Sequence, residues 1–470
     1  MKKVRIGFVP LHRNSFDTKW AVEIKNRVVK ASAKLEMVEL VYPDGSLTNM
    51  GLVGDEADAQ KTIHLFKEKD VQGILLGTMT FGEELAGVTV AEEFERYPLM
   101  VFGTKEPETK PSVFKWSDSF CGTLSLASDL YRRKIPFIFL GIVFPEEEAF
   151  LKGLENFVRT SAVVRSFLGA RVGLVGQRPE GFETVTYNEA VMAELYKQRV
   201  IHATIFSIVE AARKLNDQDK EVTKIIKDMG AVNVSGVPSK ELVKMAKLEV
   251  ALRNLVNEKG LDIMGVRCWT EIENYYGIYP CSTMGRLTQS GIMTSCEADV
   301  YGALTMLMQY KASLGTSPPH FIDWTIANPK DRNVFLAWHC GNAPSNLACA
   351  YSPSALTYHN GHYTSTGEKC YGTMDMILKP GVVTLCRLAE YNGQFKMLVT
   401  KGEIVKMNDE LSRKALKAGS SAWVRVADLD KLYRTLVAEG FVHHASMIHG
   451  DYSECIKQAC MLLNIKVIEV

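Results

Sequence analysis

The hydrophobic pattern of the first third of the chain alternates between two periods. Short runs rich in apolar and β-branched residues, such as Lys3–Pro10 and Val71–Met79, read as buried strands. Between them lie segments such as Thr18–Leu35, whose apolar residues recur at helical spacing. Strands that alternate with helices predict βαβ units and a parallel, doubly wound sheet.

A second α/β pattern begins after a long helical stretch at Pro145–Gly169. The segment that starts at Ala170, "ARVGLVGQ", reads as a new first strand and turn, and further helices and a strand follow it. A GxGxxG fingerprint is absent there, so the pattern does not indicate a dinucleotide site. The pattern predicts a second doubly wound domain.

The last third changes to β-formers. Residues 372–407 are rich in β-formers and are broken at Pro380-Gly381 and at Asn392-Gly393. The Asn-Gly pair lies between two strand-like runs and is a strong hairpin signal. A helix and a strand are expected at the very end, and the Gly-, Ser- and Thr-rich segment Tyr358–Gly372 is expected to be a loop. We therefore predict two Rossmann-like or flavodoxin-like α/β domains, at residues 1–168 and 169–312, followed by an antiparallel β-barrel-like domain at 313–470.

Composition narrows the class of protein. The chain has 470 residues, 23% of them charged, and a formal net charge of +1, so it carries no basic footprint for nucleic acid. Its ten cysteines are scattered without a CxxC pair, which is typical of reduced thiols. The longest apolar run, Ile135–Phe144, is too short to span a bilayer. We expect a soluble cytoplasmic enzyme without nucleic-acid or membrane partners.

Two acidic residues stand at positions where chemistry is plausible. Glu297 follows a short apolar run that ends at Cys296, at the junction with a helical pattern. Ligands bind at the carboxyl ends of parallel strands, although an acid in the first turn of a helix also has a structural reason. Asp323 lies between Ile322 and Trp324, where a carboxylate is costly unless it is paired or binds a cation.

Histidines complete the candidate set. His339 ends another apolar run, and the segment Gly440–Gly450 holds His443, His444 and His449. A histidine in an apolar stretch is more often a core or surface residue than a ligand. Two carboxylates with one imidazole and no cysteine would nevertheless form a hard site that prefers Mn²⁺, Mg²⁺ or Co²⁺ to structural zinc.

Four segments carry a resemblance to a known family. They are "CEADVYGALTMLM" from Cys296, "SFCGTLSLASDLYRRKIPF" from Ser119, "LKPGVVTLCRL" from Leu378 and "GFVHHASMIHGDY" from Gly440. With them the chain resembles the L-fucose isomerase and L-arabinose isomerase family of aldose–ketose isomerases. The resemblance implies that Glu297, Asp323 and His444 bind the metal, with Mn²⁺ expected and Co²⁺ or Mg²⁺ as alternatives. Glu297 and Asp323 would also be the catalytic acid–base pair.

The resemblance also implies residues that face the sugar. His339 would be a fourth ligand or a substrate contact. Trp423 and His443 would lie against the sugar, and Arg13 would contact a substrate oxygen or remain a surface residue. The chain departs from the family in its shorter length, in Asp323 where the arabinose branch has glutamate, and in His443 where the fucose branch has asparagine. The resemblance therefore supports the family's metal chemistry in this chain better than it supports the family's substrate.

The function implied by the resemblance is metal-dependent isomerisation of an open-chain sugar through a cis-enediol. The sugar would be of the L-fucose, D-arabinose or L-arabinose type. The alternatives are a non-catalytic sugar-binding protein and a metal-dependent aldolase or epimerase on the same framework. Family members are closed homo-oligomers, so self-association into a hexamer or a trimer-based assembly is expected.

Overall fold

The computed structural model describes residues 3–106, 117–363, 367, 369–407, 410, 416 and 419–470, without the side chains of 360–363. The chain divides into two compact units. Unit 1 is Met1–Arg165 with Glu454–Asn464, and unit 2 is Ser166–Ser453 with Ile465–Val470. Among the described residues, none of the helices is both long enough and apolar enough to cross a membrane.

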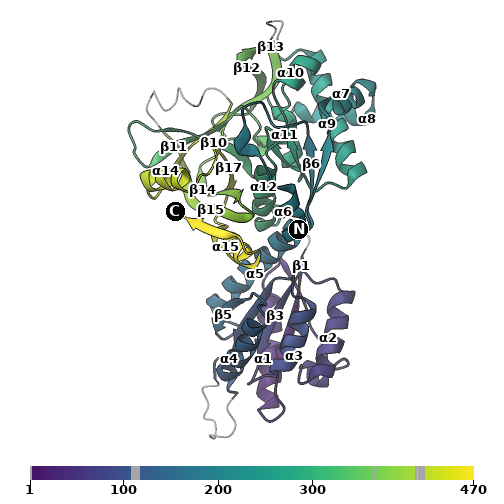
Figure 1. Ribbon diagram of the computed structural model, residues 1–470, viewed down its shortest axis with the longest axis vertical. Helices are drawn as coiled ribbons and strands as arrows, with labels where there is room; N and C mark the ends of the chain where they lie inside the picture. Colours follow the sequence, from purple (N-terminus) through teal and green to yellow (C-terminus); the bar gives the residue numbers. More distant parts are fainter. Residues whose placement is uncertain are drawn as a thin grey trace. The chain divides into compact units, whose positions relative to one another are not determined.

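Unit 1 is built on a five-stranded parallel sheet with the strand order β2-β1-β3-β4-β5 (Figure 1). This is the flavodoxin-like order of a doubly wound fold. The strands are β1 (Val4–Leu11), β2 (Val38–Val41), β3 (Gly73–Thr78), β4 (Leu99–Gly103) and β5 (Ile138–Ile142). The helices are α1 (Thr18–Ser32), η1 (Asn49–Gly51), α2 (Glu56–Glu68), α3 (Glu84–Glu93), α4 (Ser119–Arg132) and α5 (Glu148–Phe167).

The C-terminal helix α15 (Ser453–Leu462) packs in unit 1 beside α5, where the Thr160 hydroxyl donates to the Cys455 carbonyl over 3.2 Å. Helix α5 approaches β3 closely because Gly73 has no side chain there. A Cβ at Gly73 would lie 2.4 Å from the Ser161 Oγ.

Unit 2 begins with a four-stranded parallel sheet in the order β7-β6-β8-β9. The strands are β6 (Arg171–Val175), β7 (Arg199–Ala203), β8 (Ile263–Val266) and β9 (Met293–Cys296). The helices are η2 (Glu183–Val185), α6 (Glu189–Tyr196), α7 (Ile205–Lys214), α8 (Lys220–Met229), α9 (Ser239–Lys259), α10 (Glu271–Tyr276), α11 (Cys281–Gln289) and α12 (Val300–Ala312). Residue 297 therefore emerges at the carboxyl end of this sheet.

The rest of unit 2 is a closed antiparallel barrel of six strands. The order is β16-β11-β10-β17-β14-β15, and β15 closes the ring by pairing with β16. The barrel strands are β10 (His320–Ala327), β11 (Val334–His339), β14 (Gly381–Tyr391), β15 (Gln394–Val405), β16 (Ser420–Val426) and β17 (His444–His449). They are accompanied by η3 (Ser345–Leu347), β12 (Ala355–Tyr363), β13 (Lys369–Ile377), α14 (Leu429–Ala438) and β18 (Lys466–Glu469).

The fold class predicted from the sequence is confirmed, and so is the hairpin. Strands β14 and β15 are joined at Asn392 and Gly393, both with positive φ. The loop expected at Tyr358–Gly372 is wrong where the structure describes it, because β12 and β13 pair there. Residues 364–366 and 368 lie outside the described residues.

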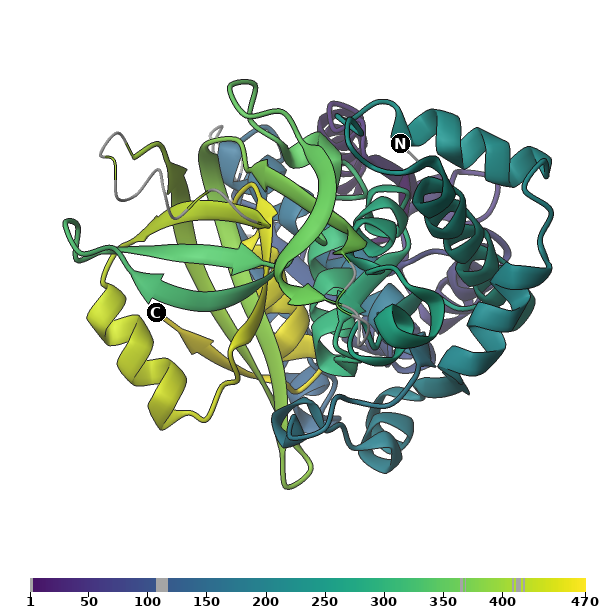
Figure 2. The ribbon, with the colours of Figure 1, turned by 90° about the horizontal axis from the view of Figure 1, so that it is seen from above.

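Helix α12 connects the parallel sheet to the barrel. Its sequence is apolar around almost the whole circumference, so it is buried between β8 and β9 on one side and β14 and β17 on the other. Figure 2 shows the green and yellow strands of the barrel beside the teal helices of the same unit. The barrel approaches closely at Gly302, where a Cβ would lie 2.5 Å from the Phe321 ring. This packing holds the turn before α12 against strands β10 and β17.

Candidate metal centre and active site

A left-handed turn aims Glu297 at the barrel. Glu297 and Ala298 both have φ of 58°, a conformation that costs a non-glycine residue about 1–3 kcal/mol. The Ala298 N–H donates to the Val266 carbonyl over 3.2 Å, and Gly265 makes room for the turn. Such strain persists only where the surrounding structure enforces it, so the packing around this junction must hold the turn in place.

Asp323 and His444 come from neighbouring strands of the barrel. They are direct partners in the antiparallel pair β10–β17, so their side chains leave the sheet on the same face. His339 ends the next strand, β11. The Phe321 ring packs against both imidazoles, with centroid distances of 5.4 Å to His339 and 4.8 Å to His444.

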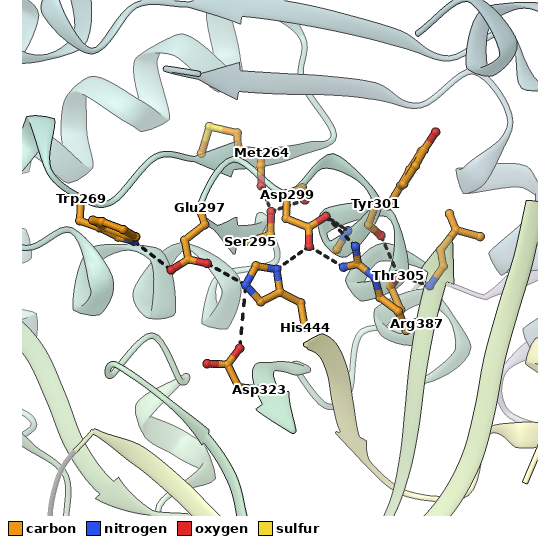
Figure 3. Close-up of polar contacts among 12 residues, drawn as sticks. Met264, Trp269, Ser295, Glu297, Asp299, Tyr301, Thr305, Asp323, Arg387 and His444 are labelled. Atoms are coloured by element: carbon orange, nitrogen blue, oxygen red, sulfur yellow. Dashed lines mark hydrogen bonds and ion pairs between the residues drawn. The ribbon is translucent and has the colours of Figure 1, made fainter. Parts of the chain in front are cut away.

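The side chains of Asp323 and His444 meet Glu297 in one cluster (Figure 3). The His444 Nε2 lies 2.7 Å from the Glu297 Oε2 and 3.9 Å from the Asp323 Oδ1. The Trp269 indole donates to the other oxygen of Glu297 over 3.0 Å. The structure thus brings together the two carboxylates and the imidazole that the sequence pointed to.

The other nitrogen of His444 is held by a buried ion pair that the sequence did not reveal. The His444 Nδ1 lies 2.8 Å from the Asp299 Oδ2, and Asp299 also pairs with the guanidinium of Arg387 on β14. Asp299 caps α12 through the Gly302 N–H as well. All three charged groups are buried, so each depends on the others for compensation.

The electrostatics of the cluster follow from this pairing. Burial lowers the pKa of His444, but its hydrogen bonds to Asp299 and Glu297 outweigh that effect and raise it to about 9. Burial raises the pKa of Glu297, yet the hydrogen bond and charge of His444 bring it down to about 2. Burial likewise opposes ionisation of Asp299, but Arg387 and His444 hold its pKa well below the usual range. Without a cation, His444 is therefore an imidazolium at neutral pH.

The remaining candidates lie at different distances from this cluster. His443 is exposed, and its ring centroid is 4.1 Å from that of His444. Phe182, in the loop after β6, covers His443 edge-on at 5.5 Å and Trp269 at 5.6 Å. His449 points elsewhere, because its Nε2 donates to the Lys379 carbonyl.

Trp423 and Arg13 lie in other settings. Trp423 is buried in a hydrophobic cluster with Val334 and Leu336. It is the register partner of Leu336, three residues from His339, so it leaves the barrel on the opposite face. Arg13 belongs to unit 1, where its guanidinium pairs with Glu83 at 2.7 Å and lies over the Phe81 ring.

The donor set fits a hard divalent cation. One ligand atom each from Asp323, His339 and His444 lie within 4.8 Å of one another, and so do atoms of Glu297, His443 and His444. The Asp323 Oδ1 is buried and has no hydrogen-bond partner among the described residues. A histidine ligand usually donates its second nitrogen to a carboxylate, and Asp299 is placed to accept from His444 in this way.

Comparisons with known proteins agree with this architecture. The family model "Fucose/sulfoquinovose isomerase, N-terminal domain" matches residues 7–168, and "L-fucose isomerase, C-terminal domain" matches residues 337–470. Proteins named sulfoquinovose isomerase from Priestia aryabhattai and Priestia megaterium are each 24% identical over 99% of both chains. A protein of the same name from Alkalicoccus urumqiensis is 24% identical over 84% of this chain and 86% of its own.

Proposed function

Because the chain belongs to the fucose isomerase family and is a sugar isomerase, we propose that it converts an open-chain aldose into the corresponding ketose with one divalent cation per subunit. The observation that carries the proposal is the convergence of Glu297, Asp323 and His444 from three separate elements. A buried cluster of two carboxylates and an imidazole has a clear role in cation-assisted proton transfer.

Glu297, Asp323 and His444 would hold the cation, with Mn²⁺ expected and Co²⁺ or Mg²⁺ as alternatives. When bound, the cation would act as a Lewis acid that polarises the substrate carbonyl. The carboxylates then have a second task. One of them removes the proton from C2 of the aldose while O1 gains a proton, which gives the cis-enediol. A carboxylic acid of the same pair then returns a proton to C1 while the O2 hydroxyl gives up its own, which leaves the ketose.

The two carboxylates differ in their surroundings, which suits paired acid–base work. Glu297 is tied down by Trp269 and His444, whereas the Asp323 Oδ1 is without a hydrogen-bond partner in the described part of the chain. Phe182 and Trp269 cover the cluster on one side, and apolar rings there would limit the access of water to the enediol.

The substrate we propose first is sulfoquinovose, because relatives that match over the full length carry that name. Such a sugar ends in a sulfonate at C6. A cavity of about 680 Å³ lies along the loop that bears Phe182, and Arg178 and Arg267 both line it, together with Glu180 and Glu183. Arg178 has no hydrogen bond or ion pair within the described residues, which leaves its guanidinium available to an anion.

The test is a panel of aldoses assayed for ketose formation with added Mn²⁺. The panel contains sulfoquinovose, its uncharged counterpart glucose, L-fucose, D-arabinose and L-arabinose. We expect the fastest conversion with sulfoquinovose, and an Arg178→Gln variant should raise KM for it without raising KM for an uncharged sugar. Equal rates with glucose would remove the sulfonate from the proposal, and cleavage of the carbon chain would replace isomerase by aldolase chemistry.

Isotope transfer tests the enediol route separately. A side-chain base exchanges its proton with water, so ketose formed in D₂O should carry deuterium at C1. Complete retention of the C2 hydrogen of the substrate would indicate a direct hydride shift and would take the base role from both carboxylates.

A further inference from the structure

The tautomer of His339 is fixed by the backbone. Its Nδ1 accepts a hydrogen bond from the Cys340 N–H over 2.9 Å. A ring nitrogen that accepts uses its lone pair and carries no hydrogen, so the hydrogen of the neutral imidazole resides on Nε2. The ring itself is buried and packed, with Phe321 at 5.4 Å and Trp338 stacked at 6.3 Å.

The ring of His339 lies beside the catalytic cluster. One of its nitrogens lies within 4.8 Å of a carboxylate oxygen of Asp323 and a ring nitrogen of His444. Its Nε2–H is the ring position that the Cys340 N–H leaves open. It is buried, and none of the described residues accepts its hydrogen. A buried donor without an acceptor costs about 1–3 kcal/mol. This cost indicates that an oxygen atom of a bound ligand accepts the hydrogen.

We propose that His339 is not a cation ligand but donates its Nε2–H to the substrate oxygen that changes from carbonyl to enediolate during isomerisation. The inference rests on the proposed function. A nitrogen that bears a hydrogen has no lone pair for a metal, whereas it is well suited to an oxygen that gains negative charge. The Asp323 Oδ1 nearby has no hydrogen-bond partner among the described residues, so the same space also offers a buried acceptor to the reacting atoms.

Measurements of Mn²⁺ and of turnover separate the two roles. His339→Leu removes the donor, His339→Gln keeps an N–H near the position of Nε2, and His444→Gln serves as the ligand control. Each protein is loaded with Mn²⁺, dialysed and assayed for bound metal, for the rise in Tm on Mn²⁺ titration, and for kcat and KM with sulfoquinovose. Circular dichroism spectra check that each variant is folded.

We expect His339→Leu to retain one Mn²⁺ per chain and the same rise in Tm as the wild type. Its kcat should fall about 10²–10³-fold, the usual effect of losing one donor to a developing oxyanion. His339→Gln should recover part of that loss, and His444→Gln should lose the metal. Should His339→Leu not fold, His339→Phe carries the metal test, since its ring keeps much of the shape but has no atom that can bind Mn²⁺.

Loss of Mn²⁺ from the His339 variants to the same extent as from His444→Gln would make Nε2 a ligand and overturn the inference. Wild-type turnover in His339→Leu would overturn it as well. Failure of the proposed function gives a different result, in which the wild type itself binds no Mn²⁺ or isomerises none of the sugars in the panel.

Discussion

At the scale of the residue, the protonation state of His444 depends on pH. Its folded-state pKa of about 9 lies above the ordinary value of 6.5 because Asp299 and Glu297 stabilise the imidazolium. A raised pKa contributes stability that is fully present below pH 6.5 and is lost as the pH rises through 9. Asp323, His443 and the rest of this cluster also face the His444 ring. This contribution to stability therefore comes from the whole cluster and not from His444 alone.

We therefore expect the metal-free protein to lose thermal stability between pH 6.5 and pH 9, by about 3 kcal/mol at most. Mn²⁺ needs the unprotonated Nε2, so its stabilising effect should grow over the same range. Melting curves of the EDTA-treated protein with and without Mn²⁺ measure both trends. A Tm that is independent of pH in this window would contradict the pairing of His444.

Asp299 orients His444 without reaching the substrate. Asp299→Asn keeps the shape of the side chain but removes the charge that Nδ1 and Arg387 both rely on. Loss of such an outer partner lowers metal affinity about 10–100-fold, and the unpaired Arg387 should cost about 3–5 kcal/mol of stability. Asp430→Asn, which removes an exposed pair with Arg434, is the matched control and should leave both quantities unchanged.

The sequence pointed to the residues that converge but not to those that support them. Asp299 looks like an ordinary helix cap, which it also is. Arg387 in the apolar run "TLCRLA" was the available signal, because a buried charge needs a partner. That partner lies 88 residues away, and no local pattern identifies a contact across such a separation. The roles assigned to Trp423, His443 and Arg13 stay predictions.

At the scale of the element, the turn after β11 sets the position of His339. Gly341 has φ of 114°, and a Cβ there would lie 2.3 Å from the Met374 backbone nitrogen in β13. We expect Gly341→Ala to lower Tm and to reduce turnover, because β13 must move away. Gly393 also has a positive φ, but it has open space around it. Gly393→Ala therefore measures the effect of backbone strain without crowding. If both variants lost the same amount of Tm and turnover, the contact with β13 would not be the cause.

Local signals explain which elements were predictable. Helical and strand periods and the Asn392-Gly393 turn act over a few residues, and the structure confirms them. Closure of the barrel by β15 and β16 pairs residues about twenty positions apart. A pattern that acts over a few residues does not determine the register across that separation. The Gly, Ser and Thr content of segment 358–372 favours a loop, whereas pairing between β12 and β13 overrides that propensity.

At the scale of the whole molecule, the expected homo-oligomer stays a prediction, and the position of Arg13 offers a way to test it. Arg13 follows β1 at the carboxyl end of the unit 1 sheet, where α/β domains bind ligands. We predict an assembly of at least three chains in which this edge covers the cluster of a neighbouring subunit. Sedimentation as a 52.4 kDa monomer at micromolar concentration would contradict it.

Mixing two defective subunits tests whether the active site is shared. Arg13→Ala keeps Glu297, and Glu297→Gln keeps Arg13, so each homo-oligomer alone should be nearly inactive. After the two are dissociated and reassembled in equal amounts, about a quarter of shared sites would combine both intact residues by random pairing. Activity should then rise to about that fraction of the wild type. The control is the same mixture without dissociation, which should stay inactive. Activity no greater than the sum of the two parents after reassembly would place Arg13 outside the neighbouring site.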